Sequence, residues 1–286
     1  MTETLSTEGG RNVLRIERRL AHPQEKVWRA ITRPDHLSRW FPATVEFDLV
    51  TGAEVSFDMD GEGTMSADGT VTVVDPPRRF AFTWHGEVLD WELHPEGDGC
   101  LLVFRHTFDD RAGAASFCSG WLRCLDALDD VVGDTPVTHR APSPELHDHY
   151  VDRFGLDEPA VVDDGDKWRV RVERQLIRPA EDAWALLDTG DGDVPGGFTH
   201  DRLTAGALVR QEPARVLEFD WSAGEHTAGR VRWEFTTGTG HGARLVVTQT
   251  GPAALPGERD TAVRAWPQRV ARLAEQLRST AARYDE

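Results

Sequence analysis

The sequence has almost no lysine, few cysteines and no long apolar stretch. Lys26 and Lys167 are the only lysines among 32 basic residues, and the formal net charge is −17. Such a charge repels nucleic-acid phosphates and anionic lipid, so we expect neither a nucleic acid nor a membrane as partner. The apolar runs are a handful of residues long, which is too short to span a bilayer.

The cysteine count also excludes some architectures. Cys100, Cys118 and Cys124 form an odd set without a CxxC pair, so neither a disulfide framework nor a zinc site is expected. We interpret them as small, reduced core residues. The N-terminal stretch MTETLSTEGGRN lacks the apolar segment of a secretory signal. These features predict a cytoplasmic protein, and the abundance of Ala, Gly, Asp and Arg is typical of bacteria with GC-rich genomes.

Motifs of the common cofactor and hydrolytic enzymes are missing. No GxSxG, Walker-type, GxGxxG or HExxH pattern occurs, so we expect no cofactor and no metal. Three polar clusters imitate metal sites, and their spacing predicts solvated surface for each. They are Asp90, Glu92 and His94; His147, Asp148 and His149; and Asp188, Asp191 and Asp193.

Two stretches 156 residues apart are nearly the same. RIERRLAHPQEKVW begins at residue 15 and RVERQLIRPAEDAW at residue 171, with half of the positions identical. Later segments repeat in the same order, PPRRFAFTW with EPARVLEFDW and WELHPEGDGCLLVFRHT with WEFTTGTGHGARLVVTQT. Tryptophans recur at matched positions: Trp28/Trp184, Trp84/Trp221, Trp91/Trp233 and Trp121/Trp266. A period this long predicts two copies of one domain rather than a solenoid.

The pattern within one copy predicts an antiparallel sheet followed by a long helix. Residues 13–20 alternate as a strand, and Pro23 then suits the first turn of a helix. Strands are expected at 44–50, 53–59, 69–75, 79–85, 88–94 and 100–108. The apolar face of the last helix is formed by Phe117, Trp121, Leu125, Leu128 and Val132. A curved sheet with a helix across it buries both apolar faces.

This order of elements resembles the helix-grip fold of the START/Bet v1-like (SRPBCC) superfamily. ERxLxxPxExVWxA, WF, DPPRRFAFTW and GWLRCLDAL resemble the branch named after the C-terminal domain of the activator of Hsp90 ATPase. The expected fold class is therefore α+β, with two tandem helix-grip domains. We predict a disordered tail at 1–11, a first domain with a C-terminal helical extension at 12–157, and a shortened, degenerate second domain at 158–286.

The second copy departs from the pattern in two places. Trp28 and Pro77 are 49 residues apart, whereas Trp184 and Pro213 are 29 apart, so the second copy lacks about one hairpin. Pro267 follows Trp266 and predicts either a late start or a kink in the last helix. We hypothesise that the first copy keeps a ligand cavity and that the second is mainly structural. The extension carries Leu146, Tyr150 and Phe154 at helical spacing, which predicts a short helix packed on the first copy.

The resemblance implies a cavity between the sheet and the helix of the first copy. The candidate lining residues are Trp40, Phe57, Trp84, Trp91, Phe104, His106, Phe117 and Trp121. His106 has the strand parity of Cys100 and Leu102, which predicts an inward side chain. It either orients a ligand, acts as an acid or base, or is a buried histidine with satisfied hydrogen bonds. Gln249 stands at the corresponding point of the second copy, which weakens the catalytic interpretation.

The expected function is non-enzymatic binding of a small hydrophobic or aromatic molecule. An enzyme of the polyketide cyclase or dehydratase type is the first alternative, because the superfamily shares this fold. A protein-interaction module like an Hsp90 co-chaperone, with an unknown protein partner, is the second. Fold similarity alone does not transfer function.

Overall fold

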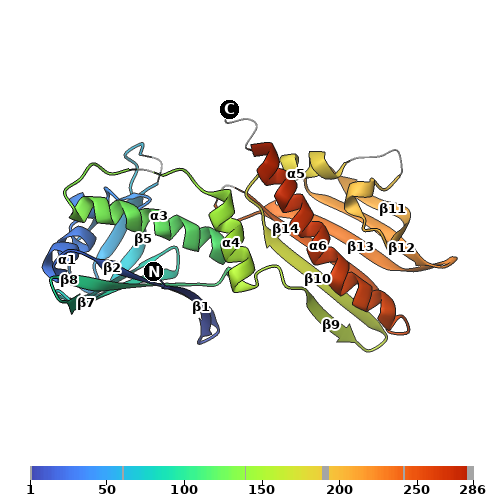
Figure 1. The fold of residues 1–286 in the computed structure, drawn as a ribbon, viewed down its shortest axis with the longest axis horizontal. Coiled ribbons are helices and arrows are strands. Elements are labelled where there is room, and N and C mark those ends of the chain that lie inside the picture. Colours follow the sequence, from blue (N-terminus) through green and yellow to red (C-terminus); the bar gives the residue numbers. More distant parts are fainter. Residues whose placement is uncertain (1, 60, 139, 189–192, 241, 282–286) are drawn as a thin grey trace. The chain divides into compact units, whose positions relative to one another are not determined.

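The computed structural model describes residues 2–59, 61–138, 140–188, 193–240 and 242–281. The chain divides into two compact units, Met1–Ser143 and Pro144–Glu286. Each is an antiparallel sheet with a long helix across one face (Figure 1). The α+β class expected from the sequence is therefore confirmed for both units.

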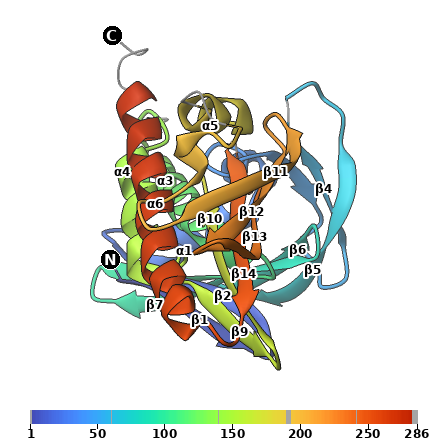
Figure 2. The same cartoon turned by 90° about the vertical axis from the view of Figure 1, so that its right-hand side faces the viewer.

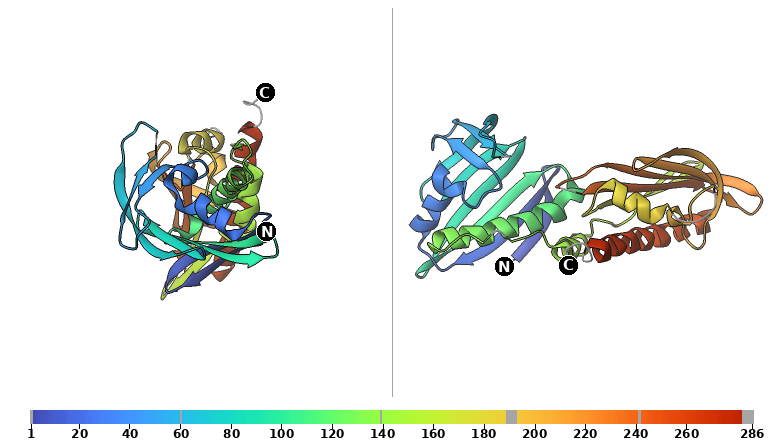
Figure 3. Two further views of the ribbon diagram at one scale, coloured as in Figure 1. Left: turned by 90° about the vertical axis from the view of Figure 1, so that its left-hand side faces the viewer. Right: turned by 90° about the horizontal axis from the view of Figure 1, so that it is seen from above.

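The first unit contains eight strands and its long helix comes last. The strands are β1 (Thr2–Glu8), β2 (Arg11–Leu20), β3 (Thr44–Phe47), β4 (Glu54–Asp58), β5 (Ser66–Asp75), β6 (Arg79–Trp84), β7 (Glu87–Glu96) and β8 (Gly99–Phe108). The helices are α1 (Gln24–Thr32), α2 (Pro34–Leu37), the short 3₁₀ helix η1 (Arg111–Gly113) and α3 (Ala114–Val132). The sheet order is β1-β2-β8-β7-β6-β5-β4-β3, and the sheet bends around the helices (Figure 3).

The sequence explains why α3 lies on the sheet. Cys118, Trp121, Leu125 and Leu128 recur at helical spacing and are all buried, so this face packs on the inner side of the sheet. Strand residues alternate in the same sense, with Phe104 and His106 of β8 buried. The core of the unit therefore lies between α3 and the sheet.

The second unit repeats this arrangement with fewer strands. It contains α4 (Pro144–Phe154), β9 (Ala160–Asp164), β10 (Lys167–Gln175), α5 (Ala180–Leu187), η2 (Gly196–Phe198), β11 (Thr204–Glu212), β12 (Val216–Ala223), β13 (His226–Thr237), β14 (Ala243–Pro252) and α6 (Pro256–Ala281). The order β9-β10-β14-β13-β12-β11 matches that of the first unit without β3 and β4, and α6 crosses the sheet (Figure 2). The domain duplication itself stays a prediction.

The sequence pattern did not predict the first strand of either unit. Residues 2–8 do not form a disordered tail, because β1 pairs antiparallel with β2 from Thr2 opposite Glu17 to Glu8 opposite Arg11. β9 likewise pairs with β10, from Lys167 opposite Asp164 to Arg171 opposite Ala160. Both strands are mostly exposed and lie at a sheet edge, where backbone hydrogen bonds to one neighbour hold them without a buried side-chain pattern.

The predicted domain boundary at 157/158 is also corrected, because α4 belongs to the second unit. Asp148 of α4 pairs with the buried Arg174 of β10 at 2.8 Å and with Arg278 of α6 at 3.1 Å. His147 and Asp148 are buried rather than solvated. An ion pair of this kind gives no periodic apolar signal, so the sequence pattern could not assign the helix to its partner.

The last helix begins at Pro256, so the predicted late start after Pro267 is wrong. The helix continues through Pro267, whose missing N–H removes one backbone hydrogen bond. Trp266, Val270 and Leu273 are completely buried on either side of it. Packing of this apolar face therefore offsets the cost of the proline. No helix in the described ranges is both long and apolar enough to cross a membrane.

None of the three cysteines is in a disulfide, and Cys100 and Cys118 are buried whereas Cys124 is half-buried. Burial raises the pKa of Cys100 and of Cys124 to about 11. At about pH 8 each then has a thiolate fraction about 100-fold below that of an ordinary cysteine. We expect a correspondingly slow reaction of the folded protein with a thiol reagent such as Ellman's reagent, and fast reaction of every thiol after unfolding in guanidinium. A rapidly reacting thiol in the folded protein would contradict this expectation.

Candidate functional site

The eight side chains predicted for the cavity meet on the inner face of the first sheet. Six are buried, whereas Trp84 and Phe117 are half-buried. Ring contacts connect them, with these centroid distances: Trp40–Trp91 6.4 Å, Phe57–Trp84 5.3 Å, Trp91–Phe104 5.2 Å, Phe104–Trp121 4.7 Å and His106–Phe117 4.6 Å. Aromatic pairs at these distances stabilise a core beyond their buried area. The His106 ring also lies 5.8 Å from Trp121, and Phe41 contacts both Trp84 and Trp121, so the candidate residues belong to one continuous aromatic interior.

Two central members of this interior were missed from the sequence. Phe41 lies 5.2 Å from Trp84 and 5.6 Å from Trp121, joining the sheet to the helix. Phe82 lies 5.2 Å from Trp91. The parity of β6 would have found Phe82, because it lies two residues from Trp84. Phe41 follows α2 in a turn, where no periodicity indicates direction.

His106 is held at both ring nitrogens. Trp121 Nε1 donates to His106 Nδ1 at 3.1 Å, and His106 Nε2 lies 2.7 Å from Glu87 Oε2. Because an indole nitrogen can only donate, Nδ1 must be the acceptor and Nε2 carries the proton. The imidazole is therefore neutral in this arrangement and donates to the Glu87 carboxylate. We call this chain of hydrogen bonds the Glu87–His106–Trp121 relay.

Glu87 is the polar site residue that the sequence did not reveal. It is the first residue of β7 and lies opposite Trp84 in the β6–β7 pairing. Its side chain is 26% exposed, whereas that of His106 is 2% exposed, so the relay runs from the surface into the interior. Trp91 was predicted to line the cavity, and extending its strand parity by four residues gives Glu87. The inner face of a strand is normally apolar, so this signal was easy to overlook.

Two buried indole N–H groups in the wall have no hydrogen-bond partner among the described residues. They are Nε1 of Trp84 and Nε1 of Trp91. Trp84 lies opposite Glu87 across the β6–β7 turn, and Trp91 lies deeper, completely buried. A buried donor without a partner costs free energy, and such exceptions are uncommon in proteins. Each could be satisfied by an acceptor atom of a bound molecule.

The strand registers define the counterpart of this site in the second unit. His106 lies opposite Leu14 and Leu89, and Gln249 lies opposite Val170 and Val231. Trp266 Nε1 donates to Gln249 Oε1 at 2.7 Å, which repeats the bond from helix to sheet. The sequence match of His106 with Gln249 is thus reproduced by register and by hydrogen bonding.

In the second unit a glycine stands at the strand position of the Glu87 carboxylate. The register that equates His106 with Gln249 equates Glu87 with Gly229. A Cβ atom at Gly229 would lie 2.0 Å from the Thr250 carbonyl oxygen, so no side chain fits there. Trp168 and Trp221, with ring centroids 5.9 Å apart, lie in the same row of the sheet. The second unit therefore replaces the relay's outer end with a tryptophan pair.

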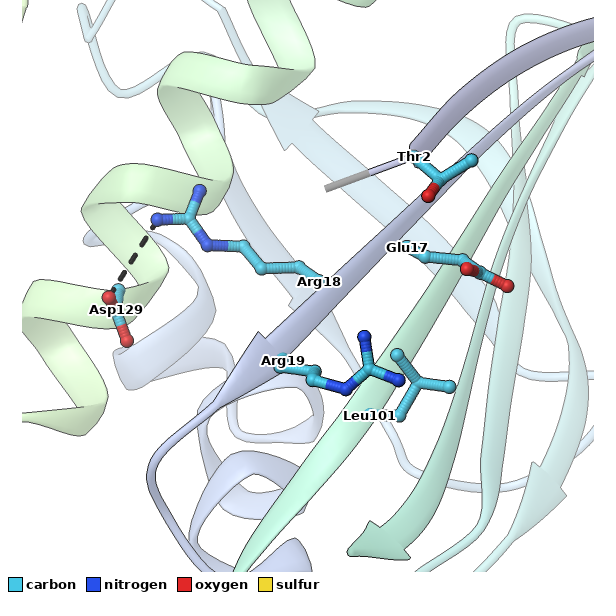
Figure 4. A pocket seen from close by; sticks show the side chains of 6 residues that line it. All are labelled: Thr2, Glu17, Arg18, Arg19, Leu101 and Asp129. Carbon is cyan, nitrogen blue, oxygen red and sulfur yellow. Dashed lines mark ion pairs between the residues drawn. The ribbon is translucent and has the colours of Figure 1, made fainter.

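The other candidate sites do not assemble. No group of metal-ligating side chains occurs in the part of the chain that the structure describes, and Asp191 lies outside it. Asp90 is buried on the outer face under Arg79, which donates to it at 2.6 and 3.0 Å. A hollow of about 290 Å³ at β2 is lined by Thr2, Glu17, Arg18, Arg19, Leu101 and Asp129 (Figure 4). Its lining is mainly charged and includes none of the eight predicted residues.

The bent antiparallel sheet around a C-terminal helix, with an aromatic interior between them, defines each unit as a helix-grip, Bet v1-like domain. Residues 21–133 match the family model described as "Activator of Hsp90 ATPase homolog 1-like protein". The resemblance inferred from the sequence is therefore confirmed for the first unit. The second unit lies outside this match.

Solved structures of similar fold are also found. A conserved protein of unknown function, EF2215 from Enterococcus faecalis, is 20% identical, with 53% of this chain and 89% of that chain covered and a TM-score of 0.46. CalU16 from Micromonospora echinospora is 24% identical over 54% of this chain and 95% of its own, with a TM-score of 0.42. DynU16, from the dynemicin biosynthetic locus, is 18% identical over 83% and 86%, with a TM-score of 0.36. No curated protein matches the chain.

Proposed function

We propose that the first unit binds a small hydrophobic or aromatic molecule in its aromatic interior, without transforming it. The observation that carries this proposal is the Glu87–His106–Trp121 relay, a chain of polar groups that runs into an otherwise apolar interior. Pockets for small molecules combine apolar and aromatic walls with a few polar groups that fix orientation. The ligand enters at the end where Trp84, Glu87 and Phe117 are partly exposed.

The unpartnered indole N–H groups of Trp84 and Trp91 support the same proposal. An oxygen or nitrogen acceptor on the ligand removes the cost of leaving these donors buried and unsatisfied. The rings around them supply flat apolar surface for the rest of the molecule. A ligand with an aromatic or alicyclic frame and one or two polar atoms fits this wall.

An enzyme of the polyketide cyclase or dehydratase type is the second candidate, because His106 beside Glu87 resembles an acid–base pair. A catalytic imidazole must present one nitrogen to the substrate. Nδ1 of His106 accepts from Trp121, and Nε2 donates to Glu87. Both nitrogens are engaged within the protein, which favours a binding role over proton transfer by His106.

We further propose that the second unit is mainly structural. The position of Glu87 is occupied there by Gly229, and Trp168 with Trp221 fills the corresponding end of the interior. The missing β3–β4 hairpin removes the wall that carries Phe57 in the first unit. We also propose that the protein is located in the bacterial cytoplasm, a reducing compartment, which is consistent with cysteines that form no disulfide.

Binding is tested with N-phenyl-1-naphthylamine, an uncharged apolar probe whose fluorescence rises in apolar surroundings. We expect saturable binding to the whole chain and at least about 10-fold weaker binding to Phe117→Asp, because a charge at the entrance opposes entry of an apolar molecule. Native mass spectrometry of the freshly purified protein should also show a co-purified small molecule.

Ser116→Asp is the matched control, because it adds the same charge to the neighbouring residue of α3. Its affinity for the probe should stay within about 2-fold of the unmodified protein, a difference well below 1.4 kcal/mol. Absence of saturable binding, or equal weakening by both substitutions, would contradict the proposed site.

A further inference from the structure

We propose that the ligand of this site is a cation, an amine or quaternary ammonium carried on an aromatic or apolar frame, whose charge lies against Glu87. This inference rests on the proposed function and specifies its ligand class. It depends on three features of the outer end of the relay. These are a carboxylate with one oxygen already hydrogen-bonded to a neutral histidine, aromatic rings on both sides of it, and nearby arginines that are paired with other acidic groups.

The first feature is the charge state around Glu87. His106 is neutral because its Nδ1 accepts from Trp121, so it donates a hydrogen bond without supplying a positive charge. The hydrogen bond at 2.7 Å occupies one oxygen of the carboxylate and fixes its orientation. An ionised carboxylate has about four lone-pair sites, so the group retains acceptor capacity for a ligand. His106 is thus a positioning residue, and Glu87 is the group that meets the ligand.

The second feature is the aromatic surroundings. Trp84 lies opposite Glu87 on β6, and continuing the β7–β8 register places Phe108 on its other side. Phe108 and Phe117 have ring centroids 4.7 Å apart, and both contact the His106 ring. Ring faces attract cations within about 6 Å, and most strongly where water is partly excluded. A carboxylate between such rings matches an ammonium group better than a neutral donor.

The third feature is the disposition of nearby arginines. Arg11 approaches this end and donates to the Gly86 carbonyl at 3.2 Å, but its Nε is paired with Asp109 at 2.8 Å. Arg105, on the outer face of β8, pairs with Glu8 at 2.8 Å. The formal net charge of −17 attracts cations to the protein as a whole. An anionic ligand would have to approach the Glu87 carboxylate against this net negative charge, with both arginines already paired to acidic side chains.

Three ligands with the same ring system separate charge from apolar contact: 2-naphthylmethylamine, which is protonated at neutral pH, 2-naphthalenemethanol and 2-naphthoate. Titration by isothermal calorimetry at moderate salt should give the order amine, alcohol, carboxylate, with the amine at least about 10-fold tighter than the alcohol. Glu87→Gln should bring the amine to the affinity of the alcohol and leave the alcohol within about 2-fold. The amide oxygen of the glutamine still accepts from His106, so the relay is preserved.

Glu92→Gln is the matched control, because Glu92 lies on the same strand with opposite parity and faces outward. It should change none of the three affinities. Equal binding of amine and alcohol by the unmodified protein would overturn the cation inference while leaving the proposed function intact. If none of the three binds and the naphthylamine probe also fails, the proposed function itself is wrong. The comparison of amine and alcohol uses the unmodified protein alone. It therefore tests the inference even if Glu87→Gln folds poorly.

Discussion

Replacing Arg174 by methionine should destabilise the second unit by about 3–5 kcal/mol, because it leaves buried acidic groups without their positively charged partner. Arg174 is 4% exposed and pairs with both Asp148 and Asp157. Methionine keeps most of the apolar stem and removes the charge together with the N–H groups that donate to the two carboxylates. Native-state hydrogen exchange would measure this as a lower opening free energy for amides of the β10–β14 ladder. Amides of the β2–β8 ladder in the first unit serve as the internal control and should be unchanged.

A second substitution separates charge from packing. Asp148→Asn in the Arg174→Met background removes one of the carboxylates that lost its positive partner, so part of the lost stability should return. If Arg174→Met alone changes the β10–β14 amides by less than about 1 kcal/mol, the buried ion cluster does not hold α4 to this unit. The assignment of α4 to the second unit would then lose its energetic basis.

The same cluster predicts how stability depends on acid. Burial by itself raises the pKa of Asp148, but the His147 ring and the charges of Arg174 and Arg278 outweigh burial, so the pKa is lower than usual. As pH falls, the unfolded chain therefore takes up the proton first. The contribution of Asp148 to the free energy of unfolding is complete above about pH 4, the ordinary pKa of an aspartate. It is lost as the pH falls through the lower pKa of the folded state. In Asp148→Asn, the opening free energy of the β10–β14 amides should fall less steeply as the pH is lowered below about 4.

Gly229→Ala should destabilise the second unit by about 3 kcal/mol or more, because the added methyl group has no space. Its Cβ would lie 2.0 Å from the Thr250 carbonyl oxygen and 2.8 Å from Trp221 Nε1. The Trp221 indole N–H donates to that same oxygen at 2.7 Å, so relief requires breaking this bond or parting β13 from β14. Urea unfolding followed by tryptophan fluorescence, together with exchange of the β13 amides, measures the loss.

Gly257→Ala provides the matched control for this substitution. Gly257 stands in the first turn of α6, where a Cβ would meet nothing within 4 Å. The change should be within about 1 kcal/mol of neutral, since alanine is the better helix former. A mild effect at Gly229 would mean that the row of Trp168 and Trp221 can move, and that the second interior is able to open.

The relay shows how far sequence reasoning reached into the candidate site. Strand parity correctly placed His106 inward, and helical spacing placed Trp121 on the face of α3 that meets it. Parity assigns a side chain to a face but not to a partner. The hydrogen bond that fixes the His106 tautomer joins β8 to α3, and its distance depends on how far the helix lies above the sheet.

Other elements lay beyond any local pattern. β1 and β9 lack an apolar alternation, so their strands are specified by backbone pairing with β2 and β10. Phe41 lies in an irregular turn, and its contacts with Trp84 and Trp121 depend on where α2 ends. Each of these features depends on contacts between residues that are distant in the chain.

The sequence by itself determined most of the elements of the first unit, their order and the two similar halves, because apolar periodicity and turn residues act over a few neighbouring positions. Tertiary structure alone decided which unit holds α4, which carboxylate meets His106, and that Gly229 leaves no room for a second one. These outcomes depend on charge pairing and on Å-scale space between strands and helix, which a linear pattern does not encode.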